Sequence, residues 1–191
     1  MLTEIPRGFQ RVALELGFSV ELLTIIHRTF EVRNLVVKAA SQPLNADELM
    51  YLHKYRPENE FHEAFKYLQH LQFTSTTLEH CICFALVVFT NLTFNVMRYG
   101  VLWQQVRESL THAVLNCRES STYGACGLMW SMMMAICSWT GRLGLEPNGE
   151  RVLADMQDRF PITSTWNDAQ AILREFLLTP ELDEQLSKCW A

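Results

Sequence analysis

The sequence contains few basic residues. Lys and Arg total 16, against 21 Asp and Glu, and no run of four basic residues occurs along the 191 positions. Nucleic-acid binding is driven largely by basic side chains that displace counterions from phosphates. The formal net charge of −5 therefore argues against a nucleic-acid-binding surface, and we expect no direct contact with DNA or RNA.

The sequence also lacks the short motifs of common catalytic and metal sites. It has no GxSxG nucleophile elbow, no P-loop and no glycine-rich dinucleotide turn. The segment from His62 to Lys66 begins like the zinc motif HExxH, but Lys66 stands where the second histidine is needed. We predict that the protein holds no metal and uses no cofactor.

Cysteines at metal-binding spacing are absent as well. No CxxC occurs, and Cys81 and Cys83 point to different faces of a helix. Most of the cysteines lie in apolar segments, where a free thiol behaves as a small hydrophobic group. With no signal peptide, this pattern predicts a reducing intracellular compartment, cytoplasmic or, for a regulatory domain, nuclear. The six cysteines are Cys81, Cys83, Cys117, Cys126, Cys137 and Cys189.

The residues that are present favour an all-α domain. Apolar residues make up 49% of the chain and recur at helical spacing, and no segment alternates as a β-strand does. We predict a single domain, residues 1–191, of about nine packed helices. An irregular lead-in, residues 1–18, docks on it through Ile5, Phe9 and Leu14. The predicted helices cover residues 19–40, 45–56, 58–73, 78–99, 102–118, 123–139, 147–160, 165–178 and 180–190.

Two of these helices are apolar enough to be buried. Residues 123–139 carry no charge and are rich in Met and Trp, so we expect them to form the central helix. Residues 81–89 are apolar on every face, but this run is far shorter than the roughly 20 residues that span a bilayer. We therefore predict a second core helix and no membrane span.

Several segments carry a resemblance to a known family. They are IPRGF at residues 5–9, SVELL at 19–23, LEHCICFALVVFTNLTF at 78–94, GLMWSMMM at 127–134, and the closing stretch from Trp166 through Phe176 to Trp190. Together they resemble the C-terminal regulatory domain of fungal zinc binuclear-cluster transcription factors. The resemblance covers nearly the whole chain and implies a helical regulatory domain of fungal origin.

The chain departs from that family in one respect. Family members carry six closely spaced cysteines that bind two zinc ions and contact DNA, and this sequence has no such cluster. The sequence is consistent with two alternatives: a piece excised from a transcription factor, or a stand-alone descendant that has lost DNA binding.

Polar groups within apolar helices are the candidate catalytic residues. Asn91 and Asn95 lie one turn apart on one face of the helix predicted over residues 78–99. A buried amide without partners costs about 1–3 kcal/mol, so these side chains either bond to each other and to neighbouring helices or face a cavity. His112, on the next helix, is the third candidate.

The Met- and Trp-rich helix offers the same choice between packing and pocket. Trp130, Met133 and Met134 either fill the core or line a pocket for an apolar molecule, with Trp103 at its rim. The leading hypothesis is a stand-alone, transcription-factor-derived domain of fungal secondary metabolism that binds an apolar metabolite. In its enzymatic version Asn91, Asn95 and His112 donate hydrogen bonds during a cofactor-free cyclisation or isomerisation. The alternative is a regulatory domain that acts through protein partners, and a homodimer stays open.

Overall fold

The all-α fold predicted from the sequence is confirmed. The computed structural model describes residues 2–70, 77–96, 100–141 and 144–190, apart from the side chains of residues 60, 61, 65 and 68–70. Within these ranges the chain is helical except for short connections and one hairpin whose strands have two residues each. The helices are α1 Arg7–Leu16, α2 Val20–Ala39, α3 Ala46–Lys54, α4 Pro57–His70, α5 Leu78–Phe94, α6 Val101–Asn116, α7 Thr122–Ser138, α8 Pro147–Arg159, α9 Trp166–Leu173 and α10 Pro180–Ser187, with 3-10 turns at Leu2–Glu4 and Pro161–Thr163.

Side-chain caps fix where several helices begin. The Ser19 hydroxyl accepts a hydrogen bond from the Leu22 amide, and Asn45 forms a capping box with Glu48. Thr77 caps α5 in the same way. The end predicted for α4 at Phe73 lies outside the described residues.

The irregular lead-in predicted for residues 1–18 is wrong, because residues 7–16 form helix α1. Pro6 and Gly17 mark its two ends: Gly17 takes the left-handed conformation, with φ 69°, that a C-cap glycine adopts without strain. A Cβ on Gly8 would lie 2.5 Å from the Phe176 ring, so glycine lets the two segments meet there. Phe9 is buried as predicted, whereas Leu14 is 75% exposed.

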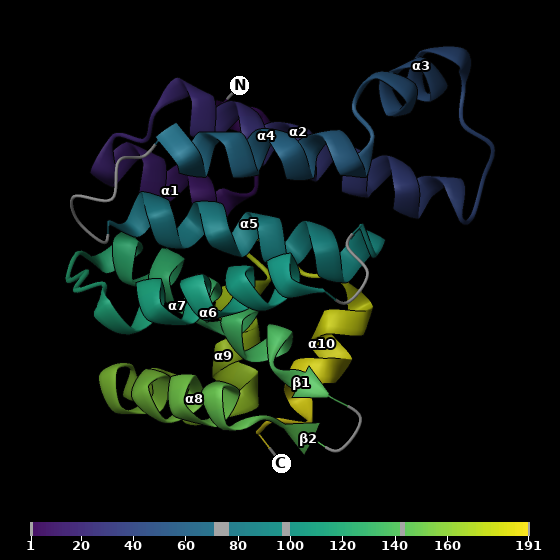
Figure 1. Cartoon of the computed structure of the whole chain (residues 1–191). Helices are drawn as coiled ribbons and strands as arrows, with labels where there is room; N and C mark the ends of the chain where they lie inside the picture. The colour runs from purple at the N-terminus through teal and green to yellow at the C-terminus, as the bar shows by residue number, and fades with distance from the viewer. Residues whose placement is uncertain (1, 71–76, 97–99, 142–143, 191) are drawn as a thin grey trace.

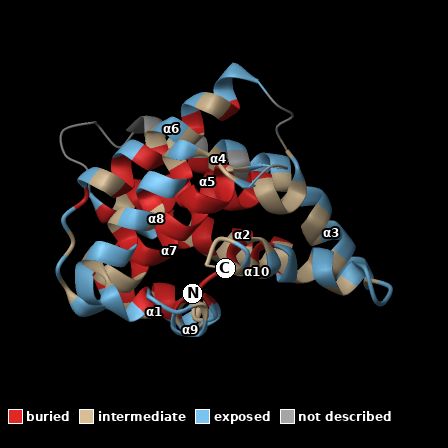
Figure 2. Cartoon of the chain, turned by 90° about the horizontal axis from the view of Figure 1, so that it is seen from below, coloured by how far each residue is buried: buried red, intermediate tan, exposed pale blue. Residues whose placement is uncertain are grey.

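Helix α7 is the centre of the molecule. It packs against α1, α5, α6, α8, α9 and α10, while α5 lies between α7 and α4 (Figure 1). Every residue from 127 to 139 is buried, which confirms the central Met/Trp-rich helix (Figure 2). No described helix has the length and apolarity needed to cross a membrane.

Two further segments differ from the prediction. Residues 140–141 and 144–145 pair as the antiparallel strands β1 (Thr140–Gly141) and β2 (Gly144–Leu145), which the helical pattern did not indicate. Helix α9 ends at Leu173 instead of near Leu178, because the following residues turn inward to bury Phe176. The residue before Pro180 is also disfavoured in a helix. Residues 174–176 therefore form turns at the end of α9, and residues 177–179 connect them to α10.

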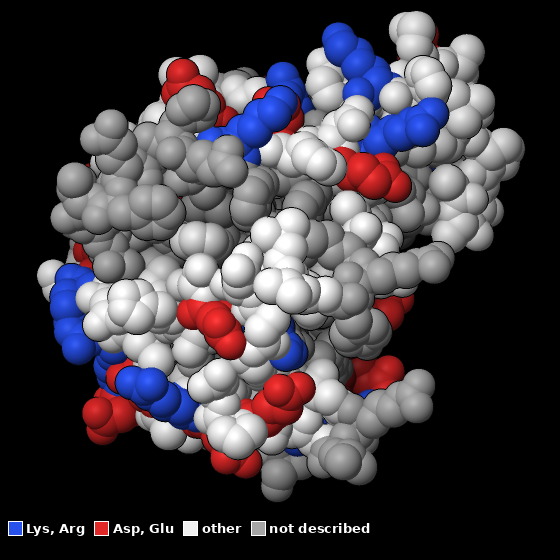
Figure 3. All heavy atoms as spheres, viewed as in Figure 1, with Lys and Arg blue, Asp and Glu red and all other residues white. Residues whose placement is uncertain are grey.

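Helix α3 lies apart from the rest of the chain. It projects from the end of α2 and has no buried residue (Figures 1 and 2). Leu49 and Met50 are exposed by 56% and 67%. On the face shown in Figure 3, Lys and Arg are interspersed with Asp and Glu, so this face carries no extended patch of one sign.

Candidate functional site

The residues predicted to wall an apolar pocket are packed into the core. Trp130, Met133 and Met134 have 0% exposure, so neither solvent nor a water-sized void touches them. The Trp130 ring meets Phe9 edge-on, with centroids 5.0 Å apart, and its Nε1 donates to the Leu177 carbonyl at 3.0 Å. Close packing of this kind leaves no room for a ligand beside these side chains.

The other predicted site residues lie at separate places. Trp103 is 7% exposed and Asn91 6%, so both belong to the packed interior. Asn95 is not on a helical face, because α5 ends at Phe94 and Asn95 is its exposed C-cap residue, with φ 51°. His112 is exposed and lines a pocket between α6 and α8. Neither Asn91 nor Asn95 lines that pocket. The structure does not bring the three candidate hydrogen-bond donors around one described pocket.

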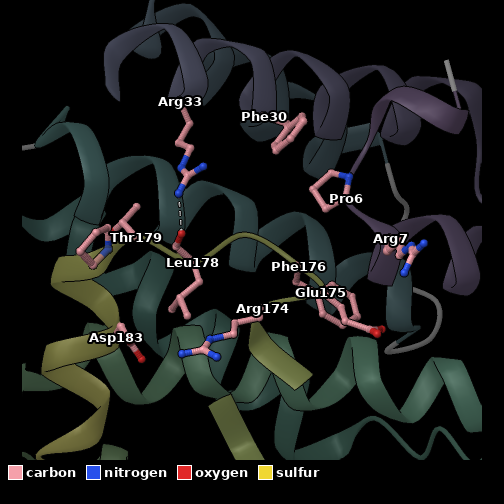
Figure 4. A pocket seen from close by; sticks show the side chains of 11 residues that line it. Pro6, Arg7, Phe30, Arg33, Arg174, Glu175, Phe176, Leu178, Thr179 and Asp183 are labelled. Carbon is pink, nitrogen blue, oxygen red and sulfur yellow. Dashed lines mark hydrogen bonds between the residues drawn. The ribbon is translucent and has the colours of Figure 1, made fainter. Parts of the chain in front are cut away.

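A pocket with a different lining lies between α2 and the connection from α9 to α10. Its volume is about 630 Å³, within the range of small-molecule sites. Pro6 and Arg7 lie at one end and Thr179 and Asp183 at the other (Figure 4). We call it the Arg33 pocket, and its lining residues are Pro6, Arg7, Phe30, Arg33, Arg174, Glu175, Phe176, Leu178, Thr179, Pro180 and Asp183.

Arg33, on helix α2, places a positive charge in the pocket. Arg33 extends from α2 to the other wall, where its Nη2 donates to the Leu178 carbonyl at 2.8 Å (Figure 4). Its Nη1 donates to the Asn34 side chain at 3.1 Å, and its Nε is buried without a hydrogen-bond partner among the described residues. A guanidinium carries five N–H donors, so each terminal nitrogen of Arg33 keeps a second donor.

The cations of the pocket outnumber its available anions. Arg7, Arg33 and Arg174 have no ion-pair partner within the described part of the chain. The lining also holds two carboxylates, so its formal charge is +1. Glu175 pairs with Arg11 at 2.7 Å, and Asp183 accepts two hydrogen bonds from Gln170, at 2.7 and 2.9 Å. The lining is therefore net positive in a chain whose net charge is −5.

The remaining surface of the pocket is apolar. Phe30 lies almost one turn before Arg33 on α2, so both side chains face the same side of that helix (Figure 4). Leu178 and Pro6 add aliphatic surface, and Phe176 joins the pocket to the core through an edge-on contact with Phe9 at 4.9 Å. The pocket thus combines a guanidinium with an apolar wall.

Sequence analysis did not single out any residue of the Arg33 pocket as a site residue. The lining comes from the start of α1, from α2, from the connection after α9 and from α10. Its first and last residues, Pro6 and Asp183, are 177 positions apart in the sequence. One signal was present in the sequence: Arg33 interrupts an otherwise apolar helical stripe in α2. That signal gains meaning only once its neighbours are known.

No described group of three or more His, Cys, Asp or Glu residues is placed to hold a metal ion. Comparison of the chain with protein-family models, curated proteins and solved structures found no match in any of the three. The resemblance to fungal regulatory domains therefore stays a prediction.

Proposed function

We propose that this protein is a ligand-binding helical domain and that its ligand is a small organic anion with an apolar body, held in the Arg33 pocket. One observation carries the proposal: the pocket contains Arg33 and Arg174, which form no ion pair with any described residue, beside the apolar surface of Phe30 and Leu178. A carboxylate accepts two parallel hydrogen bonds from a guanidinium, which adds both affinity and orientation.

The small-molecule hypothesis drawn from the sequence is kept, but the proposed binding site is now the Arg33 pocket and the proposed ligand is an anion instead of a wholly apolar molecule. A wholly apolar ligand among the central helices would need space that the side chains of α7 fill. A templated cyclisation would need Asn91, Asn95 and His112 around one ligand, and these residues lie apart. We limit the proposed function to binding.

A matched set of naphthalene probes tests the proposal. The set is 2-naphthoate, the neutral isostere 2-naphthamide and the cationic naphthalen-2-ylmethylammonium, each titrated into the full chain by calorimetry. We expect 2-naphthoate to bind about tenfold more tightly than the amide, since a charge-assisted pair replaces a neutral one. Binding of all three probes with equal affinity, or of none, would contradict the proposal.

A second candidate is a regulatory domain that acts through a protein partner, as the resemblance implies. The observation that favours it is α3, which projects from the body and exposes Leu49 and Met50. A transcript whose reading frame continues upstream through six clustered cysteines would support this alternative. A frame that begins at residue 1 would count against it.

A further inference from the structure

Positive charge lies toward both ends of the Arg33 pocket. Arg7, the first residue of α1, lines the end that also contains Pro6 (Figure 4). The Arg33 guanidinium lies toward the other end, because a hydrogen bond of 2.8 Å holds it to the carbonyl of Leu178, next to Thr179. Two arginines from different helices are therefore separated along the pocket.

The carboxylates of the lining do not neutralise these ends. Glu175 forms its ion pair with Arg11, at 2.7 Å, and none with Arg7. Asp183, toward the other end, accepts two hydrogen bonds from the neutral amide of Gln170, at 2.7 and 2.9 Å. Within the described part of the chain, each end of the pocket thus keeps an arginine without an ion-pair partner.

Apolar surface separates the two charged ends. In Figure 4, Phe30 and Pro6 lie between Arg7 and Arg33, and Leu178 adds aliphatic surface to the lining. A ligand that contacts both arginines has to cross this surface, where a polar group loses hydration without gaining a partner. The volume of about 630 Å³ leaves room for such a ligand. The lining therefore favours a molecule with an apolar middle and an acidic group at each end.

We propose, on the basis of the function proposed above, that the ligand class of the Arg33 pocket is the linear dicarboxylates. One carboxylate accepts hydrogen bonds from the free donors of Arg33, with Arg174 lining the same pocket, and the second pairs with Arg7. The chain as a whole carries a net charge of −5, so its long-range field repels a second negative charge. A gain in affinity from the second carboxylate therefore has to come from contact within the pocket.

A series of α,ω-dicarboxylates, each matched with its own half-amide, tests this inference. The series runs from hexanedioate to dodecanedioate, and each compound is titrated into the full chain by calorimetry beside 2-naphthoate. A half-amide keeps the length and one carboxylate but loses the second charge. A symmetric diacid gains about twofold merely because either end can enter first. We expect the diacid of the best length to bind about tenfold more tightly than its half-amide, since an ion pair with Arg7 is added.

Two variants locate the second charge. Arg7→Gln should reduce the advantage of the diacid over its half-amide to about twofold. Arg151→Gln, the same change at an exposed residue of α8, should keep it at about tenfold. The inference is overturned if the advantage is about twofold or less at every length, or if Arg7→Gln keeps it. Binding of 2-naphthoate would then still support the proposed function, whereas binding of neither 2-naphthoate nor any diacid would overturn both.

Discussion

Helix α7 and the Arg33 pocket are built from opposite kinds of sequence. Residues 123–139 are one continuous apolar stretch, and the structure uses them almost entirely for packing. The pocket draws its lining from four segments spread over the chain and includes five charged side chains. Soft, adaptable side chains such as Met suit either a core or a pocket, so composition alone does not separate the two. Here the core and the pocket differ in two other properties: the side chains of residues 127–139 are buried, whereas the pocket contains arginines without an ion-pair partner among the described residues.

The sharpest test of the packing role is Trp130→Ala. The indole is fully buried and hydrogen-bonded to the Leu177 carbonyl, so we expect a loss of about 3–5 kcal/mol in the free energy of unfolding. Urea denaturation followed by circular dichroism measures it. Met50→Ala, at a residue 67% exposed on α3, is the control and should change stability by less than about 0.5 kcal/mol. A pocket-lining role for Trp130 would give a much smaller loss.

Gly8→Ala tests the contact that connects the core with the pocket. The added methyl group would meet the Phe176 ring, which itself lines the pocket, so we expect a loss of about 1–3 kcal/mol from overpacking. The same change in a Phe176→Leu background should cost less, because the ring is gone. Equal costs in both backgrounds, measured as a double-mutant cycle, would show that Gly8 and Phe176 are not coupled.

Arg174→Gln probes the charge of the pocket without disturbing the fold. Arg174 is exposed and has no ion-pair partner among the described residues, so the free energy of unfolding should change by less than about 0.5 kcal/mol. Binding of 2-naphthoate should weaken by about tenfold at most, with 2-naphthamide unaffected. Arg151→Gln, the same change on the exposed side of α8, should leave both affinities at the wild-type value. A loss of equal size in the two variants would point to a general charge effect.

The smallest expected effect concerns Asn95. The sequence predicts this residue on a helical face, whereas in the structure it is the C-cap residue of α5. Its φ of 51° is the left-handed conformation that only Gly and Asn adopt readily. Asn95→Ala should therefore destabilise the protein by about 1 kcal/mol, and Asn95→Gly should be neutral. Thermal melting distinguishes the two variants. Equal melting temperatures for both would mean that the backbone there is not left-handed.

The architecture could be predicted from the sequence because it depends on local signals. Helical spacing and the caps at Ser19 and Asn45 set most boundaries to within a few residues. The sequence does not predict helix α1, because Pro6, Gly8 and Gly17 lie close together and such residues are typical of irregular chain. Two of these residues mark the ends of the helix, and Gly8 accommodates Phe176 from the far end of the sequence.

The candidate site could not be predicted in the same way. Arg33 lies in a pocket because Leu178 and Asp183, about 150 residues away in the sequence, form the opposite wall. No local sequence pattern predicts a contact between residues so far apart in the chain.

The most direct test of this account is an NMR titration of the full chain with 2-naphthoate, observing methionine methyl groups and backbone amides together. If the anion binds in the Arg33 pocket, the amides of Leu178 and Thr179 shift, and the methyl signals of Met132, Met133 and Met134 keep their positions. If the ligand enters among the central helices instead, those methionine signals shift first and most. That second result would contradict the assignment of α7 to packing and of the site to the Arg33 pocket.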